Sequence, residues 1–143
     1  MEIEMVTGRI AQNLEHLKRF TSTPNAGCTR LPFTKETRDA VDYLRKEMEE
    51  IGLEVKEDAA GNVYGILRGT DSSLPCVMTG SHIDSVLHGG NYDGIAGVVC
   101  SLEVARQIVE MGLEHRRDLV VIGFMDEEGM RFGTGYFGSG AIL

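Results

Sequence analysis

The sequence predicts an α/β fold, and three observations point to it. Apolar residues recur at helical spacing over much of the first 52 residues. Short extended apolar runs follow residue 52, and two of them flank one further segment of helical spacing. A strand, a helix and a second strand in that order are typical of a parallel pair of strands joined by a crossover helix. Of the 143 residues, 42% are hydrophobic and 25% charged, which fits one globular domain and excludes a disordered or collagen-like chain.

Two amphipathic helices are expected in the first third of the chain. The first covers roughly residues 3–20 and has one apolar face, made by Val6, Ile10, Leu14 and Leu17. Residues 21–32 are rich in Thr, Ser, Pro, Asn and Gly and predict a loop. Thr34 is placed to cap the second helix, and Gly52 to end it. The apolar stripe of this second helix is Val41, Leu44, Met48 and Ile51.

Short strands are expected after the second helix. The extended runs are residues 53–56, 63–67 and 75–79, with a turn at residues 60–62. Residues 119–125 are continuously apolar, which predicts a central strand buried on both faces. The helix before this strand is expected to face the core through Val98, Leu102, Ala105 and Val109.

Charge and composition exclude several classes of partner. Fourteen Lys and Arg against 22 Asp and Glu give a net charge of −8, which argues against nucleic acid and against anionic membrane surfaces. No apolar run approaches the roughly 20 residues of a membrane span, and the N-terminus lacks the features of a signal peptide. A cytoplasmic location is therefore expected. The three cysteines, Cys28, Cys76 and Cys100, are interpreted as reduced structural residues, the last two within apolar runs.

Three polar clusters lie where α/β proteins build their sites, next to strand ends. They are residues 80–86, residues 89–94 and residues 126–132. Taken alone, His82 and Asp84 could simply hold a loop, and Asp93 could be an ordinary helix cap. The run of three carboxylates at residues 126–128 favours function more strongly, because adjacent carboxylates repel unless cations or shared protons relieve them.

Together, one histidine and several carboxylates form a ligand set suited to Zn, Mn, Co or Ni rather than to a thiolate-bound metal. A carboxylate that bridges two ions, with a ligand on each side, would define a two-metal hydrolytic site. A further glutamate beside such ligands can act as the base that deprotonates water.

The ordered motifs GSHIDSV, GGNYDG and DEEGMRF resemble those of the amidase/hydantoinase/carbamoylase branch of the dinuclear zinc metallopeptidases, relatives of aminoacylase and carboxypeptidase. The resemblance implies a phosphorylase/aminopeptidase-like three-layer α/β/α metallohydrolase catalytic domain. Residues 1–143 would be the N-terminal portion of that domain, without the lid or dimerisation domain and the C-terminal catalytic portion. The full-length form would be a homodimer.

The resemblance also implies a role for each candidate residue. His82 would ligate one divalent ion, Glu128 the other, and Asp93 would bridge both. Glu127 would be the general base that takes a proton from the bridging water, and Asp84 would orient His82. The substrate-binding groups would come largely from the part of the family fold outside this chain, so none is assigned here.

The implied reaction is hydrolysis of a linear amide or ureido bond in a small-molecule substrate. N-carbamoyl-L-amino acids are the first candidate and allantoate is the alternative. The family supplies two further histidine ligands downstream, and His16, His88 and His115 do not replace them by motif. We therefore expect the 143-residue chain alone to bind metal weakly and to be inactive. An alternative of another class is a non-catalytic fragment that needs a partner chain.

A nucleotide-binding enzyme is the remaining alternative, and the sequence argues against it. Residues 133–138 match GxGxxG. However, a dinucleotide-binding loop lies directly between a strand and a helix, with an acidic residue about 20 positions further on. Seven residues separate the predicted strand from this match.

Overall fold

The computed structural model describes the backbone of residues 3–142 and the side chains of residues 7–142. It contains a four-stranded mixed sheet with the strand order β1-β2-β4-β3. The strands are β1 Glu54–Glu57, β2 Val63–Leu67, β3 Val77–His82 and β4 Leu119–Phe124. The helices are α1 Ile3–Leu17, α2 Lys35–Ile51, α3 Ile95–Glu110 and the single-turn α4 Phe137–Gly140. The α/β fold predicted from the sequence is thus confirmed.

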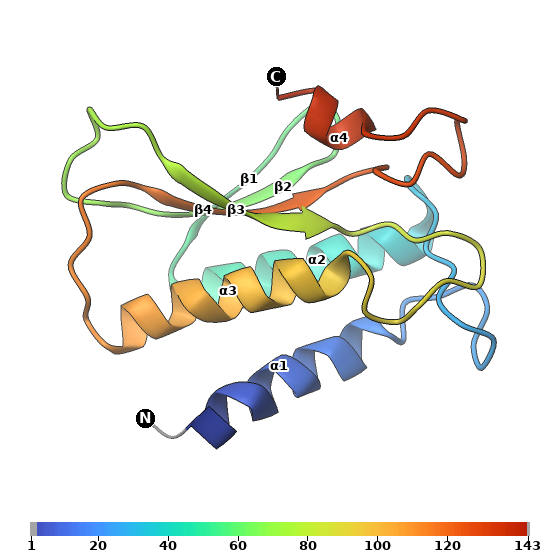
Figure 1. Cartoon of the computed structure of the whole chain (residues 1–143), viewed down its shortest axis with the longest axis horizontal. Helices are drawn as coiled ribbons and strands as arrows, with labels where there is room; N and C mark the ends of the chain where they lie inside the picture. The colour runs from blue at the N-terminus through green and yellow to red at the C-terminus, as the bar shows by residue number, and fades with distance from the viewer. Residues whose placement is uncertain (1–2, 143) are drawn as a thin grey trace.

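The sheet carries its main helices on one face (Figure 1). Helices α2 and α3 lie against that face, and α1 packs beneath α3. On the other side of the sheet, the described residues place only the short α4. Strand β4 is central, because it pairs antiparallel with β2 and parallel with β3, and its middle residues are buried. The parallel β3–α3–β4 unit brings the carboxyl ends of two neighbouring strands to one edge of the sheet.

The predicted end signal of α2 is confirmed, and the predicted capping side chain is wrong. The helix begins directly after Thr34 and ends at Gly52, whose φ of 91° is the left-handed conformation that favours glycine. The Thr34 side chain does not cap the helix, because its hydroxyl donates to the carbonyl oxygen of Leu31. Helix α1 ends at Leu17, three residues earlier than predicted, and the side chain of Val6 lies outside the described residues.

Two predictions about burial and one about a strand boundary are wrong. Strand β3 starts two residues late and runs on through His82, so the first polar cluster begins inside the strand and not after it. Val109 is 41% exposed, in the last turn of α3, where Glu110 is exposed as well. Cys76 and Cys100 are exposed, since one precedes an edge strand and the other lies on the outer side of α3.

Apolar side chains remain exposed along the free edge formed by β3 and α3. Val77 and Met78 of β3 are 49% and 42% exposed, and Val104 of α3 is 52% exposed. The core lies instead between the sheet and helices α2 and α3, and its fully buried members include Leu44, Met48, Val98 and Val121.

Among the described helices, none combines the length and the hydropathy that crossing a bilayer requires.

Arg30 joins the loop before α2 to the end of β3. Its side chain is 2% exposed, and it donates to the carbonyl oxygens of Ile83, Leu17 and Phe20. Burial lowers the pKa of this guanidinium, and nearby Asp84 acts in the opposite direction. The three hydrogen bonds that Arg30 donates replace those to water that the buried charge has lost.

We expect Arg30→Met to destabilise the chain by about 3 kcal/mol, because it leaves three buried carbonyl oxygens without a donor. Urea unfolding followed by circular dichroism measures this change. Arg116→Met is the matched control, because the Arg116 side chain is 74% exposed, and it should shift stability by less than about 0.5 kcal/mol. Equal effects of the two substitutions would contradict a structural role for Arg30.

Candidate metal centre

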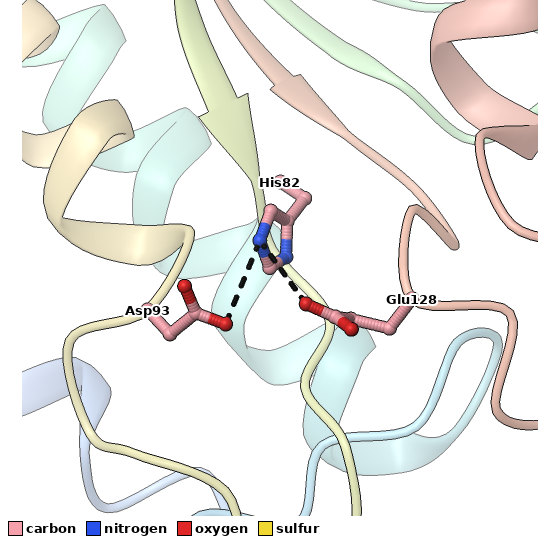
Figure 2. A group of neighbouring side chains, drawn as sticks. All are labelled: His82, Asp93 and Glu128. Atoms are coloured by element: carbon pink, nitrogen blue, oxygen red, sulfur yellow. Dashed lines mark ion pairs between the residues drawn. The ribbon is translucent and has the colours of Figure 1, made fainter.

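Three side chains from separate segments meet at the carboxyl ends of β3 and β4 (Figure 2). His82 is the last residue of β3, Asp93 lies in the loop before α3, and Glu128 follows β4. His82 Nε2 is 3.6 Å from Glu128 Oε1 and 3.9 Å from Asp93 Oδ2. One potential ligand atom from each residue lies within 4.8 Å of the others. Within the described part of the chain, no other group of three or more His, Cys, Asp or Glu side chains is arranged to hold a metal ion.

The hydrogen bond on the other side of the imidazole sets the direction of His82. Its Nδ1 is 2.9 Å from the carbonyl oxygen of Asp84. Because a carbonyl oxygen can only accept, Nδ1 carries the proton in the neutral ring, and the Nε2 lone pair faces the two carboxylates. The contact between Asp84 and the ring is therefore made by the main-chain carbonyl, while the carboxylate Oδ1 stays 3.7 Å from Nδ1.

The electrostatics of this group call for a cation. The pKa of Glu128 is raised by burial and by nearby Asp93, while His82 opposes the shift. Two carboxylates and an imidazole lone pair directed at one point repel each other unless a cation or a proton lies between them. Imidazole and carboxylate donors suit Zn, Mn, Co or Ni, so the residues fit the divalent ions expected from the sequence. The Asp93 side chain is 66% exposed, which leaves the group open on one side.

The Asp84 carboxylate holds the segment that carries the glutamates. This side chain is fully buried. Its Oδ1 accepts the backbone N–H of Glu127 and its Oδ2 that of Glu128, both at 3.1 Å. Asp84 thus fixes His82 through its carbonyl and the two glutamates through its carboxylate.

The three consecutive carboxylates at residues 126–128 point to three different places. Asp126 has a φ of 58° and is fully buried, and neither of its carboxylate oxygens has a hydrogen-bond partner. Burial, and then the charge of Asp84, raise its pKa. Glu127 accepts hydrogen bonds from Ser139 and does not join the group at His82. Only Glu128 faces the imidazole.

Ser139 is a contact that the sequence pattern did not predict. It lies 12 residues after Glu127, in a glycine-rich stretch, and no motif spacing links the two residues. The remaining histidines are engaged elsewhere. His16 stacks on Tyr43, His88 Nδ1 contacts the carbonyl oxygen of Ala26, and His115 Nδ1 contacts that of Arg117.

Gly94→Ala should weaken metal binding, because the His82 ring lies directly over this glycine. A Cβ there would come within 2.6 Å of His82 Nε2, and the φ of 68° disfavours any side chain. We expect the affinity for Co²⁺ or Zn²⁺ to fall at least about 10-fold in calorimetric titrations. Gly90→Ala, in the same loop but with open space around it, is the control and should bind like the unmodified chain. Unchanged affinity of Gly94→Ala would exclude His82 as a ligand.

The sequence matches a known family over the segment that contains His82, Asp93 and Glu128. The profile of peptidase family M28 matches residues 62–142, which is more than half of the chain. An N-carbamoyl-L-amino-acid amidohydrolase of Paenarthrobacter aurescens is 45% identical over 134 residues. An allantoate amidohydrolase of Bacillus subtilis is 39% identical over 135 residues.

The fold agrees with a solved member of the same group. The crystal structure of a hydantoinase/carbamoylase family amidase from Burkholderia ambifaria superposes with a TM-score of 0.90 at 32% identity, covering 95% of this chain and 34% of that one. The two curated relatives are covered over 94% of this chain but only 32% and 33% of their own length. The chain therefore spans about a third of these proteins. Together the matches show that it belongs to peptidase family M28, in the hydantoinase/carbamoylase amidase branch.

Proposed function

We propose that this chain is the metal-binding part of an amidohydrolase that acts on N-carbamoyl-L-amino acids. The observation that carries the proposal is that the two adjacent glutamates after β4 make different contacts. Glu128 faces His82 and Asp93, while the neighbouring Glu127 is held apart from them. The 45% identity to the Paenarthrobacter amidohydrolase supports the choice of substrate class.

His82, Asp93 and Glu128 would hold two divalent ions, with Asp93 between them. Bound there, the ions would polarise the carbonyl group of the substrate and lower the pKa of the attacking water. Asp84 supports this arrangement in two ways. Its carbonyl fixes the tautomer of His82, and its carboxylate holds the backbone N–H groups of Glu127 and Glu128.

Glu127 would act as the general base. It would take a proton from the water as the water oxygen bonds to the carbonyl carbon, and then pass that proton to the nitrogen as the C–N bond breaks. From an N-carbamoyl amino acid this step would give the amino acid and carbamic acid, and the carbamic acid would then lose its remaining C–N bond to give ammonia and carbon dioxide. Proton transfer by a positioned carboxylate needs a fixed orientation, and the two hydrogen bonds to Glu127 supply one.

We also propose that turnover requires polypeptide beyond these 143 residues. Three protein ligands are too few for two ions, since a catalytic zinc commonly has three protein ligands of its own. The relatives are about three times as long as this chain, and the exposed Val77, Met78 and Val104 offer an apolar edge for further structure. In a full-length homodimer, that further part would supply the remaining ligands and the groups that select the substrate.

A chimera tests the function. This chain would replace the matching third of the Paenarthrobacter amidohydrolase, and ammonia release would be measured from N-carbamoyl-L-amino acids and from allantoate with Zn²⁺, Mn²⁺ or Co²⁺. We expect activity on the carbamoyl substrates, and a fall in kcat of about 100- to 10,000-fold on Glu127→Gln with metal content unchanged. The chimera takes its substrate-selecting groups from the Paenarthrobacter part, so the substrate choice is tested on the full-length protein that contains this chain. Faster hydrolysis of allantoate by that protein would favour the allantoate amidohydrolase alternative, for which the Bacillus relative is the precedent.

The control substitution in the chimera is Glu114→Gln, an exposed glutamate away from the centre, which should leave kcat unchanged. Full activity of the Glu127→Gln chimera would rule out the proposed base. Turnover by the isolated 143-residue chain, if it were lost on Glu127→Gln, would refute the need for further polypeptide.

A further inference from the structure

Two adjacent glutamates with the same side chain make different contacts at the metal centre. Asp84 holds the backbone N–H groups of both, at the same distance of 3.1 Å. The main-chain contacts with Asp84 therefore do not by themselves explain why Glu128 faces His82 and Glu127 does not. The difference must lie in what the side chains touch.

The Glu127 carboxylate is held at both of its oxygens by one residue. The backbone N–H of Ser139 donates to Oε1 at 2.7 Å, and the Ser139 hydroxyl donates to Oε2 at 2.8 Å. Hydrogen bonds to an ionised carboxylate are shorter and stronger than those between neutral groups. Glu127 could join His82 and Asp93 only by giving up both bonds.

The segment that carries Ser139 is anchored independently of Glu127's side chain. The N–H of Tyr136 donates to the carbonyl oxygen of Glu127, and that of Phe137 to the carbonyl oxygen of Asp126. Fully buried Asn62 donates from Nδ2 to the carbonyl oxygen of Gly138, at 2.9 Å. Its Oδ1 accepts the N–H of Met125, the residue directly after β4. Ser139 is therefore fixed relative to β4 whether or not Glu127 binds it.

We infer that Ser139 is a positioning residue that assigns the two glutamates their roles. By occupying both oxygens of Glu127, it keeps this carboxylate out of the metal ligand set and oriented as a base, and leaves Glu128 as the ligand. This inference rests on the proposed function for the role of Glu127 in proton transfer. Which of the two carboxylates joins the metal ligands, here called the sorting of the glutamates, is a property of the chain itself and can be tested without turnover.

The Co²⁺ absorption spectrum of the 143-residue chain reports which carboxylates bind the metal. At saturating Co²⁺, Ser139→Ala should change the visible spectrum, because Glu127 then keeps only the bond from the backbone N–H of residue 139 and can exchange that single bond for the ion. The double variant Ser139→Ala/Glu127→Gln should restore the original spectrum. Ser139→Thr keeps the hydroxyl and should resemble the unmodified chain, as should the control Ser72→Ala, an exposed serine.

The amide resonance of Ser139 provides a second readout without metal. A backbone N–H that donates to a carboxylate resonates downfield, and Glu127→Gln should move the Ser139 amide proton upfield in ¹⁵N-resolved spectra while leaving that of Gly140 nearly in place. In the chimera, Ser139→Ala should lower kcat about 10-fold with KM little changed, and Ser139→Thr should recover most of the loss.

Each result decides between outcomes. The sorting role is overturned if the Ser139→Ala spectrum equals the original, or if the spectrum stays altered in the double variant. Ser139 would then only stabilise the local structure. A Ser139 amide that does not respond to Glu127→Gln also overturns it. Absence of Co²⁺ binding by both the unmodified chain and the chimera overturns this inference and the proposed metal site. The expected spectra together with an inactive chimera would refute the proposed function and retain the sorting.

Discussion

The buried carboxylate of Asp84 makes the interactions on which the candidate metal centre depends. A carboxylate with no exposure to water must recover its lost hydration from the protein, and here two backbone N–H groups and the nearby charge of Arg30 provide it. Those N–H groups belong to the segment after β4, whereas Asp84 follows β3. One buried charge therefore fixes the loops after two neighbouring parallel strands, and the carbonyl of the same residue directs His82 between them.

The location of the site could be predicted from the sequence because it follows from topology. His82, Asp93 and Glu128 come from the ends or connections of two parallel strands, and a β–α–β unit brings such positions together whatever the details of the loops. Local signals predicted α2 equally well, since its apolar stripe and Gly52 act within a few residues of the chain. Predictions succeeded where the cause was periodic or topological.

The finer features depended on contacts that no local pattern encodes. The sequence predicted that Asp84 would orient His82, but whether its carbonyl or its carboxylate does so depends on the turn of the chain after β3. The contact of Ser139 with Glu127 depends on a glycine-rich segment in which Tyr136 has a φ of 60°. The exposure of Cys76 and Cys100 depends on which strand is left at the edge of the sheet.

The run of three carboxylates shows how a repulsive sequence becomes compatible with the fold. Consecutive acidic residues were expected to need cations or shared protons, and the backbone reduces that need by turning them apart. The positive φ of Asp126 sends its side chain into the interior, where burial favours the neutral form. Ser139 donates to Glu127, which leaves Glu128 as the carboxylate of the three that faces His82 and Asp93. Because burial favours the neutral form of Asp126 and Ser139 supplies two donors to Glu127, the demand for a cation is concentrated on the side chains that would bind it.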